Sequence, residues 1–334
     1  MDMTDLRFGV IGWGYWGPKI ARNLDGLPHA MVTMVADTDV KRLASLRMNQ
    51  SWVKTTLPED VFRSDVDGVI IATPVRTHYQ LAKAALLYGK HVLVEKPLTA
   101  DVTEAEELVA LAAEQQRVLM VGHTFEYNPA VNELRKLVQN GDLGKIYYIE
   151  TERLNLGLFR SDINVIWDLA PHDISILLYL LGKKPEQVKV HAHAHLQPNI
   201  HDIAHIDLGF ADAMTAHIQV SWLHPCKIRR VTVIGDAKMV VYDDTNPAEM
   251  LKIYNKGADV HADPMVSYRF GEITIPHIDW IEPLRLECED FANSIRLGAQ
   301  PRAHGRVGLE VVRVLEAAQE ALEVQKQEKL ALEL

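Results

Sequence analysis

Hydrophobic and polar residues follow two different rhythms along the chain, and the rhythm changes near residue 123. Before that point, short continuous apolar runs alternate with segments of helical periodicity. The apolar runs predict strands buried on both faces, at residues 6–11, 30–36, 68–72, 91–94 and 118–122. The helical segments are predicted at residues 18–24, 40–48, 78–88 and 100–114. Strands that alternate with helices are typical of a parallel sheet with right-handed crossovers.

After residue 123 the predicted strands change character. Val188, Val190 and Ala192 share one face of a strand, and Lys189 and His191 share the other. This period of two predicts strands with one covered and one open face, at residues 146–154, 188–196, 203–210, 214–222, 230–233 and 239–242. Helices are expected at residues 129–139, 171–181 and 308–326. The pattern after residue 123 therefore predicts an open, mostly antiparallel sheet with helices on one side.

The composition narrows the class of protein. The 334 residues are 48% hydrophobic and 24% charged, as in ordinary globular proteins. Asp and Glu outnumber Lys and Arg by 45 to 35, and the net charge of −10 disfavours nucleic acid as a partner. Cys226 and Cys288 lie far apart, which indicates neither a disulfide framework nor a zinc knuckle. With no apolar run of ~18 residues and no leader-like start, we expect a cytoplasmic protein outside the membrane.

The first predicted strand leads into the sequence GWGYWG at residues 12–17, and a helix follows. Glycines in this G-x-G-x-x-G spacing allow a tight turn and let the backbone approach a pyrophosphate, while the helix start supplies free N–H groups. We therefore predict an α/β fold that begins with a Rossmann dinucleotide-binding domain over residues 1–123. Its cofactor-binding residues include Gly12, Gly14, Tyr15, Trp16 and Gly17. A structural glycine turn is the alternative.

Asp37 ends the second predicted strand. A carboxylate at this place accepts hydrogen bonds from the ribose hydroxyls and repels the 2′-phosphate of NADP, so NAD is favoured and NADP is less favoured. Arg42, one helical turn further on, can weaken that discrimination. The alternative role for Asp37 is to cap the next helix.

Thr73 and Pro74 close the strand at residues 68–72, where a Rossmann sheet presents its crevice, and we place both at the cofactor. His78 begins the next helix. It either faces the cofactor or serves as a cap or packing residue.

Glu95, Lys96 and Pro97 follow the buried strand at residues 91–94. A strand this apolar has no packing reason to finish in a Glu-Lys pair. A lysine in the crevice can hold a substrate hydroxyl and pass on its proton as charge develops, and Glu95 and Lys96 also border the cofactor. A cis bond before Pro97 would turn the Lys96 side chain into the crevice. A surface lysine beside a turn is the alternative.

Pro171 suits the first position of a helix, so we expect Asp168 just before that helix and His172 in its first turn. Their four-residue spacing can bring both side chains to one side. The positive end of a helix favours a neutral imidazole, which can accept a proton. Taken alone, His172 also fits a capping or core histidine.

Together these motifs resemble the Gfo/Idh/MocA oxidoreductase family, because the glycine loop, Glu95-Lys96-Pro97 and Asp168-x-x-x-His172 occur in its order and at roughly its spacing. The resemblance covers essentially the whole chain. It implies that the first domain binds NAD(P) and that residues 124–334 form an α+β domain for substrate binding and oligomerisation. It also implies that Lys96, Asp168 and His172 carry catalysis, and that a homo-oligomer, a dimer or tetramer, forms through the open sheet face.

Finer features are similar to the nucleotide-sugar branch of that family, which includes UDP-N-acetylglucosamine 3-dehydrogenases and their uronate relatives. These features lie at residues 123–129, 155–160, 221–225 and 282–288. Many relatives have Gly-Gly ahead of the catalytic aspartate, whereas this chain has NVIW at residues 164–167. The resemblance implies oxidation of a sugar hydroxyl to a ketone. Candidate substrate contacts are Tyr127, Asn128, Arg153 and Arg160, since arginine binds a diphosphate or a carboxylate bidentately.

Two other functions stay open at this stage. One is the same chemistry on another substrate, in an inositol or free-sugar dehydrogenase or a 3-ketoreductase. The other is a non-catalytic NAD(H)-binding redox sensor. The complete set of Lys96, Asp168 and His172 argues against a sensor, which needs no proton relay.

His191, His193 and His195 share one face of a predicted strand. Residues two apart in a strand lie ~7 Å from each other, too far to hold one ion without help from another strand. We therefore expect no metal site and interpret the row as part of a polar sheet face at a subunit interface.

Overall fold

The computed structural model describes residues 5–44, 46, 52–260 and 265–332. The chain forms two compact units. The first contains the residues up to Tyr127 together with the returning segment Ile281–Val312, and the second contains Asn128–Trp280 and the chain from Arg313 onward. The sequence predicted one division between residues 123 and 124, without the returning segment.

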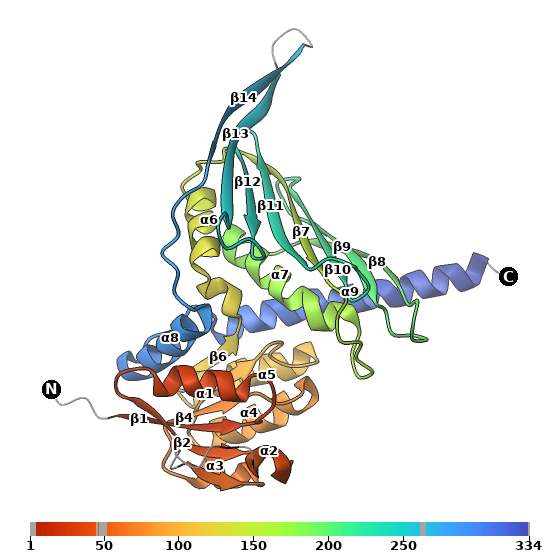
Figure 1. Ribbon diagram of the computed structural model, residues 1–334. Coiled ribbons are helices and arrows are strands. Elements are labelled where there is room, and N and C mark those ends of the chain that lie inside the picture. Colours follow the sequence, from red (N-terminus) through yellow and green to blue (C-terminus); the bar gives the residue numbers. More distant parts are fainter. Residues whose placement is uncertain (1–4, 45, 47–51, 261–264, 333–334) are drawn as a thin grey trace. The chain divides into compact units, whose positions relative to one another are not determined.

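The first unit is built on a parallel sheet of six strands in the order β3-β2-β1-β4-β5-β6 (Figure 1). The strands are β1 (Leu6–Ile11), β2 (Ala30–Ala36), β3 (Val53–Thr55), β4 (Gly68–Ile71), β5 (His91–Glu95) and β6 (Leu119–Gly122). The helices are α1 (Gly17–Asp25), α2 (Val40–Ala44), α3 (Pro58–Arg63), η1 (Val75–Thr77), α4 (His78–Leu87), α5 (Val102–Glu114) and η2 (Thr124–Tyr127). Of the helix expected at residues 40–48, most of the part beyond α2 lies outside the described residues. The strand order is that of a Rossmann sheet, which confirms the predicted fold class for this unit.

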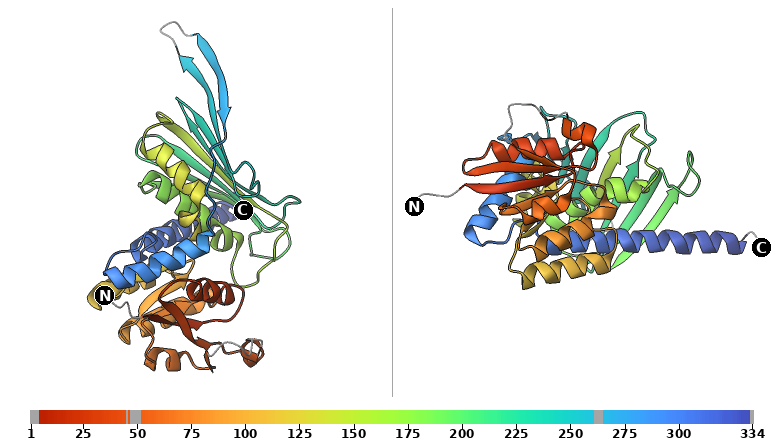
Figure 2. Two further views of the ribbon diagram at one scale, coloured as in Figure 1. Left: turned by 60° about the vertical axis from the view of Figure 1, so that its left-hand side comes forward. Right: turned by 90° about the horizontal axis from the view of Figure 1, so that it is seen from below.

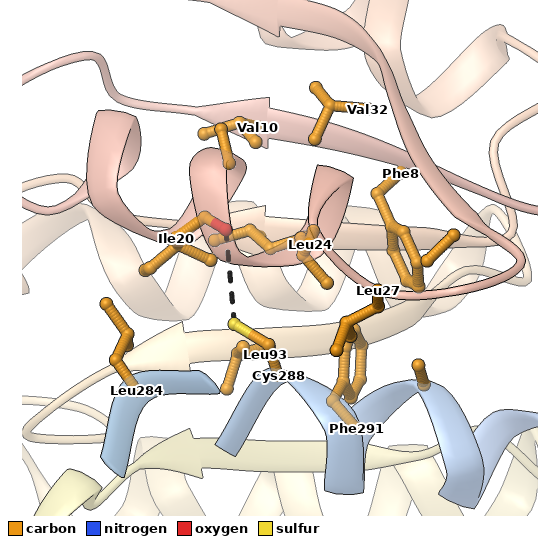
Figure 3. Close-up of a cluster of buried hydrophobic side chains, with 14 of the residues drawn as sticks. Phe8, Val10, Ile20, Leu24, Leu27, Val32, Leu93, Leu284, Cys288 and Phe291 are labelled. Atoms are coloured by element: carbon orange, nitrogen blue, oxygen red, sulfur yellow. Dashed lines mark hydrogen bonds between the residues drawn. The ribbon is translucent and has the colours of Figure 1, made fainter. Parts of the chain in front are cut away.

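A helix from late in the chain completes the first unit. Cys288 and Phe291 of α8 (Pro283–Leu297) are fully buried and pack in one core with Ile20 of α1 (Figure 3). Phe291 also meets Phe8 of β1, with the ring centroids 5.8 Å apart. Full burial of one such side chain stabilises a fold by about 1.5–3 kcal/mol, which explains why this segment folds with the first unit.

The second unit contains an eight-stranded sheet in the order β14-β13-β12-β11-β7-β10-β9-β8. Its strands are β7 (Ile146–Leu154), β8 (Gln187–His193), β9 (Ile203–Gly209), β10 (Thr215–Ser221), β11 (Ile228–Gly235), β12 (Met239–Asp243), β13 (Leu251–Val260) and β14 (Val266–Thr274). The pairing of β10 with β7 is parallel and the other described pairings are antiparallel, so the predicted open, mostly antiparallel sheet is confirmed. Figure 2 shows the β13–β14 hairpin extending past the ends of the neighbouring strands.

Helices α6 (Pro129–Gln139) and α7 (Val165–Leu181) pack on one face of this sheet. The long helix α9 (Gly305–Leu332) begins in the first unit and ends in the second. No helix in the described part of the chain has the length and apolar character that a membrane crossing requires.

Helix α7 begins earlier than the sequence predicted. The side-chain oxygen of Asn164 accepts the backbone N–H groups of Ile166 and Trp167 at 3.1 and 3.2 Å and so caps the helix. Pro171 consequently lies inside α7, and the expected start at residue 171 is wrong. An interior proline removes one helical hydrogen bond, and the cap together with the buried side chains of α7 compensates for that loss.

Candidate active site

The turn after β1 has the backbone that pyrophosphate binding needs. Gly12 has a φ of +98°, and a Cβ there would lie 2.4 Å from the carbonyl oxygen of Ala72. A Cβ on Gly17 would lie 2.1 Å from the carbonyl oxygen of Gly12, so both positions require glycine. A Cβ on Gly14 would meet only Arg42, at 3.9 Å, which leaves this stretch open to a ligand. No described side chain caps α1, and Pro18 in its first turn has no N–H group, while the N–H groups of Lys19 and Ile20 donate to the Trp16 carbonyl at 2.9 and 3.0 Å. The helix therefore offers a phosphate its positive end and the N–H of Gly17.

Tyr15 and Trp16, which the sequence placed at the cofactor, lie in this turn. Tyr15 is 72% exposed, and its ring meets that of Trp16 edge-on at 5.2 Å. The Lys19 ammonium lies 3.4 Å from the centroid of the Tyr15 ring. The two aromatic rings of the turn and the ammonium of Lys19 on α1 therefore lie together.

Asp37 fixes the glycine turn from the end of β2. Its buried carboxylate accepts the backbone N–H groups of Trp13 at 2.6 Å and Asp39 at 2.7 Å, and it lies 3.5 Å from the Arg42 guanidinium. Asp39 provides the start of α2, since its own carboxylate accepts the N–H of Lys41 at 2.9 Å. Asp39, and not Asp37, therefore caps α2.

A crevice of about 360 Å³ opens beside Asp37, at the carboxyl ends of β1, β2 and β4. This edge is where a Rossmann sheet binds its dinucleotide, and the volume suits part of a small ligand. The lining includes Gly12, Thr38, Thr73, Pro74 and Arg76. The glycine turn, the carboxylate and the crevice together fit the adenosine and pyrophosphate portions of NAD.

The imidazole of His78 connects the loop after β4 with the loop after β5. Its imidazole is 1% exposed, with Nδ1 2.9 Å from the carbonyl oxygen of Pro97 and Nε2 2.8 Å from that of Thr73. Burial lowers the pKa of His78 against the opposing effect of these carbonyls. Because both nitrogens face the backbone, the geometry favours a positioning role for His78 over direct contact with the cofactor.

Glu95 ends β5 at the same sheet edge, and Lys96 follows it. The Lys96–Pro97 peptide bond is cis. Burial raises the pKa of Glu95 to about 7, against the opposing charge of Lys96. A carboxyl group with this pKa changes protonation state near neutral pH, directly beside the lysine in the sequence.

Two further buried groups accompany Glu95. They lie in the segments 123–129 and 282–288, which the sequence singled out without giving either residue a role. His123 is fully buried, neither ring nitrogen has a hydrogen-bond partner in the described structure, and burial lowers its pKa to about 3. Glu287 of α8 is also fully buried, and burial raises its pKa well above the usual range, with the charge of Glu95 adding to the effect. A carboxylate beside Cys288 in an apolar stripe is the sequence signal that could have identified Glu287.

Asp168 and His172 lie one turn apart on α7 and share a helix face. Asp168 accepts a hydrogen bond from the indole N–H of Trp222 at 2.9 Å and lies 3.9 Å from the Arg160 guanidinium. Its place in the first turn of α7 lets the helix dipole stabilise the carboxylate. His172 lies further along α7, so its expected place in the first turn of this helix is wrong.

Tyr127 and Asn128 are buried and bonded within their own units. The Tyr127 hydroxyl donates to Asp290 at 2.7 Å and accepts the N–H of Ala303 at 3.2 Å. Asn128 caps α6 and donates from its amide to the hydroxyl of Tyr242 at 3.0 Å. These contacts favour structural roles over the substrate contacts that the resemblance implied.

Arg153 and Arg160 have opposite surroundings. Arg153 of β7 forms a bidentate pair with Asp173 of α7, at 2.8 and 3.1 Å, and the two side chains are 6% and 1% exposed. Arg160 is 39% exposed and pairs with Asp162 at 2.9 Å while remaining beside Asp168. Arg160 therefore has the exposure that substrate contact requires, whereas Arg153 fixes α7 on the sheet.

The segment at residues 155–160 lies beside the end of β10. Backbone N–H groups of this segment donate to the carbonyls of Ser221 at 3.1 Å and Trp222 at 2.9 Å. Leu156 and Leu158 are 69% and 89% exposed. Because Trp222 also holds Asp168, the two sequence segments singled out at 155–160 and 221–225 belong to one surface of the second unit.

The histidine row lies on the exposed side of β8, where His191 is in register with His205 of β9. His195 lies beyond the strand, with Nδ1 2.7 Å from the carboxylate of Asp202. Within the described ranges, no group of three or more His, Cys, Asp or Glu side chains is arranged to hold a metal ion.

Comparison with known protein families finds matches in both units of the chain. A family model described as an oxidoreductase family with an NAD-binding Rossmann fold matches residues 6–123, and the GFO/IDH/MocA C-terminal domain matches residues 131–241. A UDP-N-acetylglucosamine 3-dehydrogenase of Acidithiobacillus ferrooxidans is 30% identical over 294 residues, or 88% of this chain and 90% of that protein. Its solved structure covers 96% of this chain and 98% of its own, with a TM-score of 0.81 and 29% identity.

More distant proteins share the same architecture. An inositol 2-dehydrogenase of Rhizobium meliloti is 22% identical over 98% of this chain and 99% of its own length. The structure of GenD2 from gentamicin A biosynthesis, solved in complex with NAD, superposes with a TM-score of 0.82 over 96% of this chain and 95% of that one. At 24% identity that match shows the fold alone. The two family models span more than half of the chain and confirm the predicted NAD-binding oxidoreductase: this protein belongs to the Gfo/Idh/MocA oxidoreductase family.

Proposed function

We propose that the protein is an NAD-dependent dehydrogenase that oxidises a sugar hydroxyl to a ketone, the C3 hydroxyl of UDP-N-acetylglucosamine or of its uronate. NADP is the less favoured coenzyme because Asp37 stands at the ribose position. The similar dehydrogenase of Acidithiobacillus ferrooxidans supports this substrate. Inositol is the alternative, because an inositol 2-dehydrogenase is also among the relatives.

The observation that carries the proposal is the pair formed by Asp168 and His172 on one face of α7. Trp222 and Arg160 orient the Asp168 carboxylate beside a partly exposed imidazole. A carboxylate and an imidazole on one helix face are suited to hold a hydroxyl and to take its proton. A redox sensor has no need of this arrangement.

In the proposed reaction, the substrate hydroxyl loses a proton and its carbon loses a hydride, which leaves a ketone. NAD supplies the hydride acceptor when it is bound. His172 or Lys96 takes the hydroxyl proton, while Asp168 orients the neighbouring hydroxyls. When His172 takes the proton, the ammonium of Lys96 stabilises the alkoxide character that develops on the substrate oxygen. When Lys96 takes it, the neutral amine becomes that ammonium. Glu95, with a pKa of about 7, can exchange a proton beside that ammonium.

Substrate recognition is assigned to the surface around Asp168. The fork of Arg160 suits a diphosphate or a uronate carboxylate. The exposed Leu156 and Leu158 can cover apolar faces of the sugar or the base. Arg153 acts indirectly: its ion pair with Asp173 holds α7 in place next to His172.

The experiment is turnover of Lys96→Ala with NAD and UDP-N-acetylglucosamine. We expect kcat to fall by roughly 10²–10⁴-fold while NAD still binds, because general acid–base groups contribute about that much. Lys83→Ala is the matched control, since Lys83 lies on α4 in an ion pair with Glu107. Near-normal turnover of Lys96→Ala would overturn the assignment.

A substrate panel decides between the alternatives. UDP-N-acetylglucosamine, its uronate, inositol and free sugars are each incubated with the enzyme and NAD. The ketone is then identified by mass spectrometry, so that coenzyme retained from purification cannot hide product. A ketone from inositol alone would replace the nucleotide-sugar proposal, and no product from any compound would favour the sensor.

The open sheet face is proposed as the contact of a homo-oligomer. Tyr148, Ile234 and Met239 are neighbours in register on the outward side of β7, β11 and β12, and each is partly exposed. Beside them Arg230 lies 3.4 Å from both Glu152 and Asp243. An apolar row next to paired charges suits a self-complementary interface.

Light scattering on Ile234→Glu tests this face, because a buried carboxylate at the contact should reduce the measured mass to that of a single chain. Leu87→Glu, at an exposed leucine of α4, is the control. An unchanged mass for Ile234→Glu, or a wild-type mass of one chain, would refute the proposed contact.

A further inference from the structure

The first unit contains a second cavity, of about 460 Å³, at the edge of the Rossmann sheet opposite to the coenzyme crevice. It lies at the amino-terminal ends of β5 and β6, where His91 and Leu119 line it. The other walls come from the end of α5 with the residues that follow it, including Arg117, and from His304 and Arg306 at the start of α9. The glycine turn and Asp37 instead follow the carboxyl ends of their strands. We call this feature the basic cavity.

Four basic side chains line the basic cavity, and its lining contains no Asp or Glu. This is notable in a chain with a net charge of −10. Arg117 and Arg306 are exposed, and neither forms an ion pair with a carboxylate of the described residues. The charge of Asp67 acts on His91, where it opposes the lowering of the pKa. The carboxylate of Asp67 already accepts the backbone N–H of Arg7 at 2.8 Å. Two guanidinium groups are therefore available to an anion.

The two histidines add hydrogen-bonding capacity rather than charge. Nδ1 of His91 accepts the N–H of Val118 at 2.9 Å, which leaves Nε2 as the donor of the neutral ring. Nδ1 of His304 is buried and has no hydrogen-bond partner in the described structure. Burial, with the charge of Arg117 adding, lowers the pKa of His91 to about 4, so this ring is neutral at physiological pH.

The size and floor of the basic cavity define the rest of the ligand. A lone phosphate ion is much smaller than 460 Å³, which is within the range of sites for whole metabolites. Buried apolar side chains form part of the lining, among them Ala112, Leu119 and Pro301. The exposed amides of Gln116 and Gln300 can bond to hydroxyls or ring nitrogens.

We propose that the basic cavity binds a phosphorylated small metabolite, of the sugar-phosphate or nucleotide class, at a site separate from coenzyme and substrate. Arg117 and Arg306 hold the phosphate, His91 donates a further hydrogen bond, and the apolar floor carries the organic part. The start of α9 at Gly305 adds its partial positive charge to the same cavity.

The test is calorimetric titration of the NAD-saturated protein with ribose 5-phosphate, with ribose and inorganic phosphate as separate arms. Ribose 5-phosphate should bind more tightly than inorganic phosphate, and ribose should not bind. Arg117→Gln and Arg306→Gln should each weaken binding roughly tenfold, and the double variant roughly a hundredfold, because charge-assisted hydrogen bonds are lost. Arg285→Gln, at an exposed arginine of α8 outside the cavity, is the matched control.

Both replaced arginines are exposed, so the variants should fold, and their NAD affinity reports this directly. Equal binding by wild type and the double variant would place ribose 5-phosphate elsewhere and overturn the proposal. Absence of binding to the wild type would do the same. Inorganic phosphate binding as tightly as ribose 5-phosphate would also overturn it, because the organic part would then make no contribution.

Discussion

Replacing Arg153 by Met should destabilise the second unit strongly. The Asp173 carboxylate, 1% exposed, would stay buried. It would lose the guanidinium of Arg153 and with it both hydrogen bonds, of 2.8 and 3.1 Å. Breaking a buried pair by removing one partner costs about 3–5 kcal/mol, since the remaining charge stays buried without compensation. Urea denaturation, followed by hydrogen exchange in peptides of α7, measures the loss globally and at the helix.

Two further variants separate the explanations. Arg153→Met with Asp173→Leu removes both charges and should recover much of the lost stability, because buried ion pairs are replaced by apolar pairs at little cost. Arg160→Gln removes a partly exposed pair and should cost less than about 1 kcal/mol. A loss below 1 kcal/mol for Arg153→Met, combined with a large rise in KM, would refute the structural role and restore Arg153 as a substrate contact.

Three other changes have defined outcomes. Asp37→Ser should raise the ratio of kcat/KM for NADP to that for NAD by about tenfold or more, because it removes a negative charge and leaves Arg42 at the ribose; an unchanged ratio would exclude this position. Glu95 has a pKa of about 7 against an ordinary 4.5, so the folded state loses up to roughly 3 kcal/mol as pH rises between these values. The stability of Glu95→Gln relative to wild type should therefore increase from pH 5 to pH 8 in urea titrations, and a constant difference would contradict the burial argument. Gly12→Ala should lower the melting temperature, whereas Gly14→Ala should keep it and weaken NAD binding; equal melting temperatures would show that the turn tolerates a Cβ at residue 12.

Local patterns were sufficient to predict five strands of the first unit, β1, β2, β4, β5 and β6, and the strands β7 to β12 of the second. Continuous apolar runs belong to strands covered on both faces, and the alternation at Val188–Ala192 belongs to a strand with one open face. The glycine turn was predictable because the conformation of Gly12 and the space around Gly17 are set by a few neighbouring residues. Asp37 was predictable for the same reason, since its place depends on one strand and one turn.

Features that depend on distant partners could not be predicted in this way. The sequence analysis predicted no helix at α8, and no local pattern there shows that α1 and β1 cover its buried face. Arg153 has the chemistry of an anion ligand, and only the fold reveals that the anion is Asp173. Pro171 suggested a helix start because proline favours the first turn of a helix. The prediction failed because the cap at Asn164, several residues earlier, sets the actual start of α7.

The central proposal is that His172, on the same face of α7 as Asp168, reaches the substrate hydroxyl. A crystal structure of the complex with NAD and UDP-N-acetylglucosamine tests this directly. We predict that the C3 hydroxyl lies within about 2.6–3.2 Å of a ring nitrogen of His172, next to C4 of the nicotinamide. A complex in which His172 does not reach that hydroxyl, or in which another carbon faces C4, would contradict the proposed chemistry.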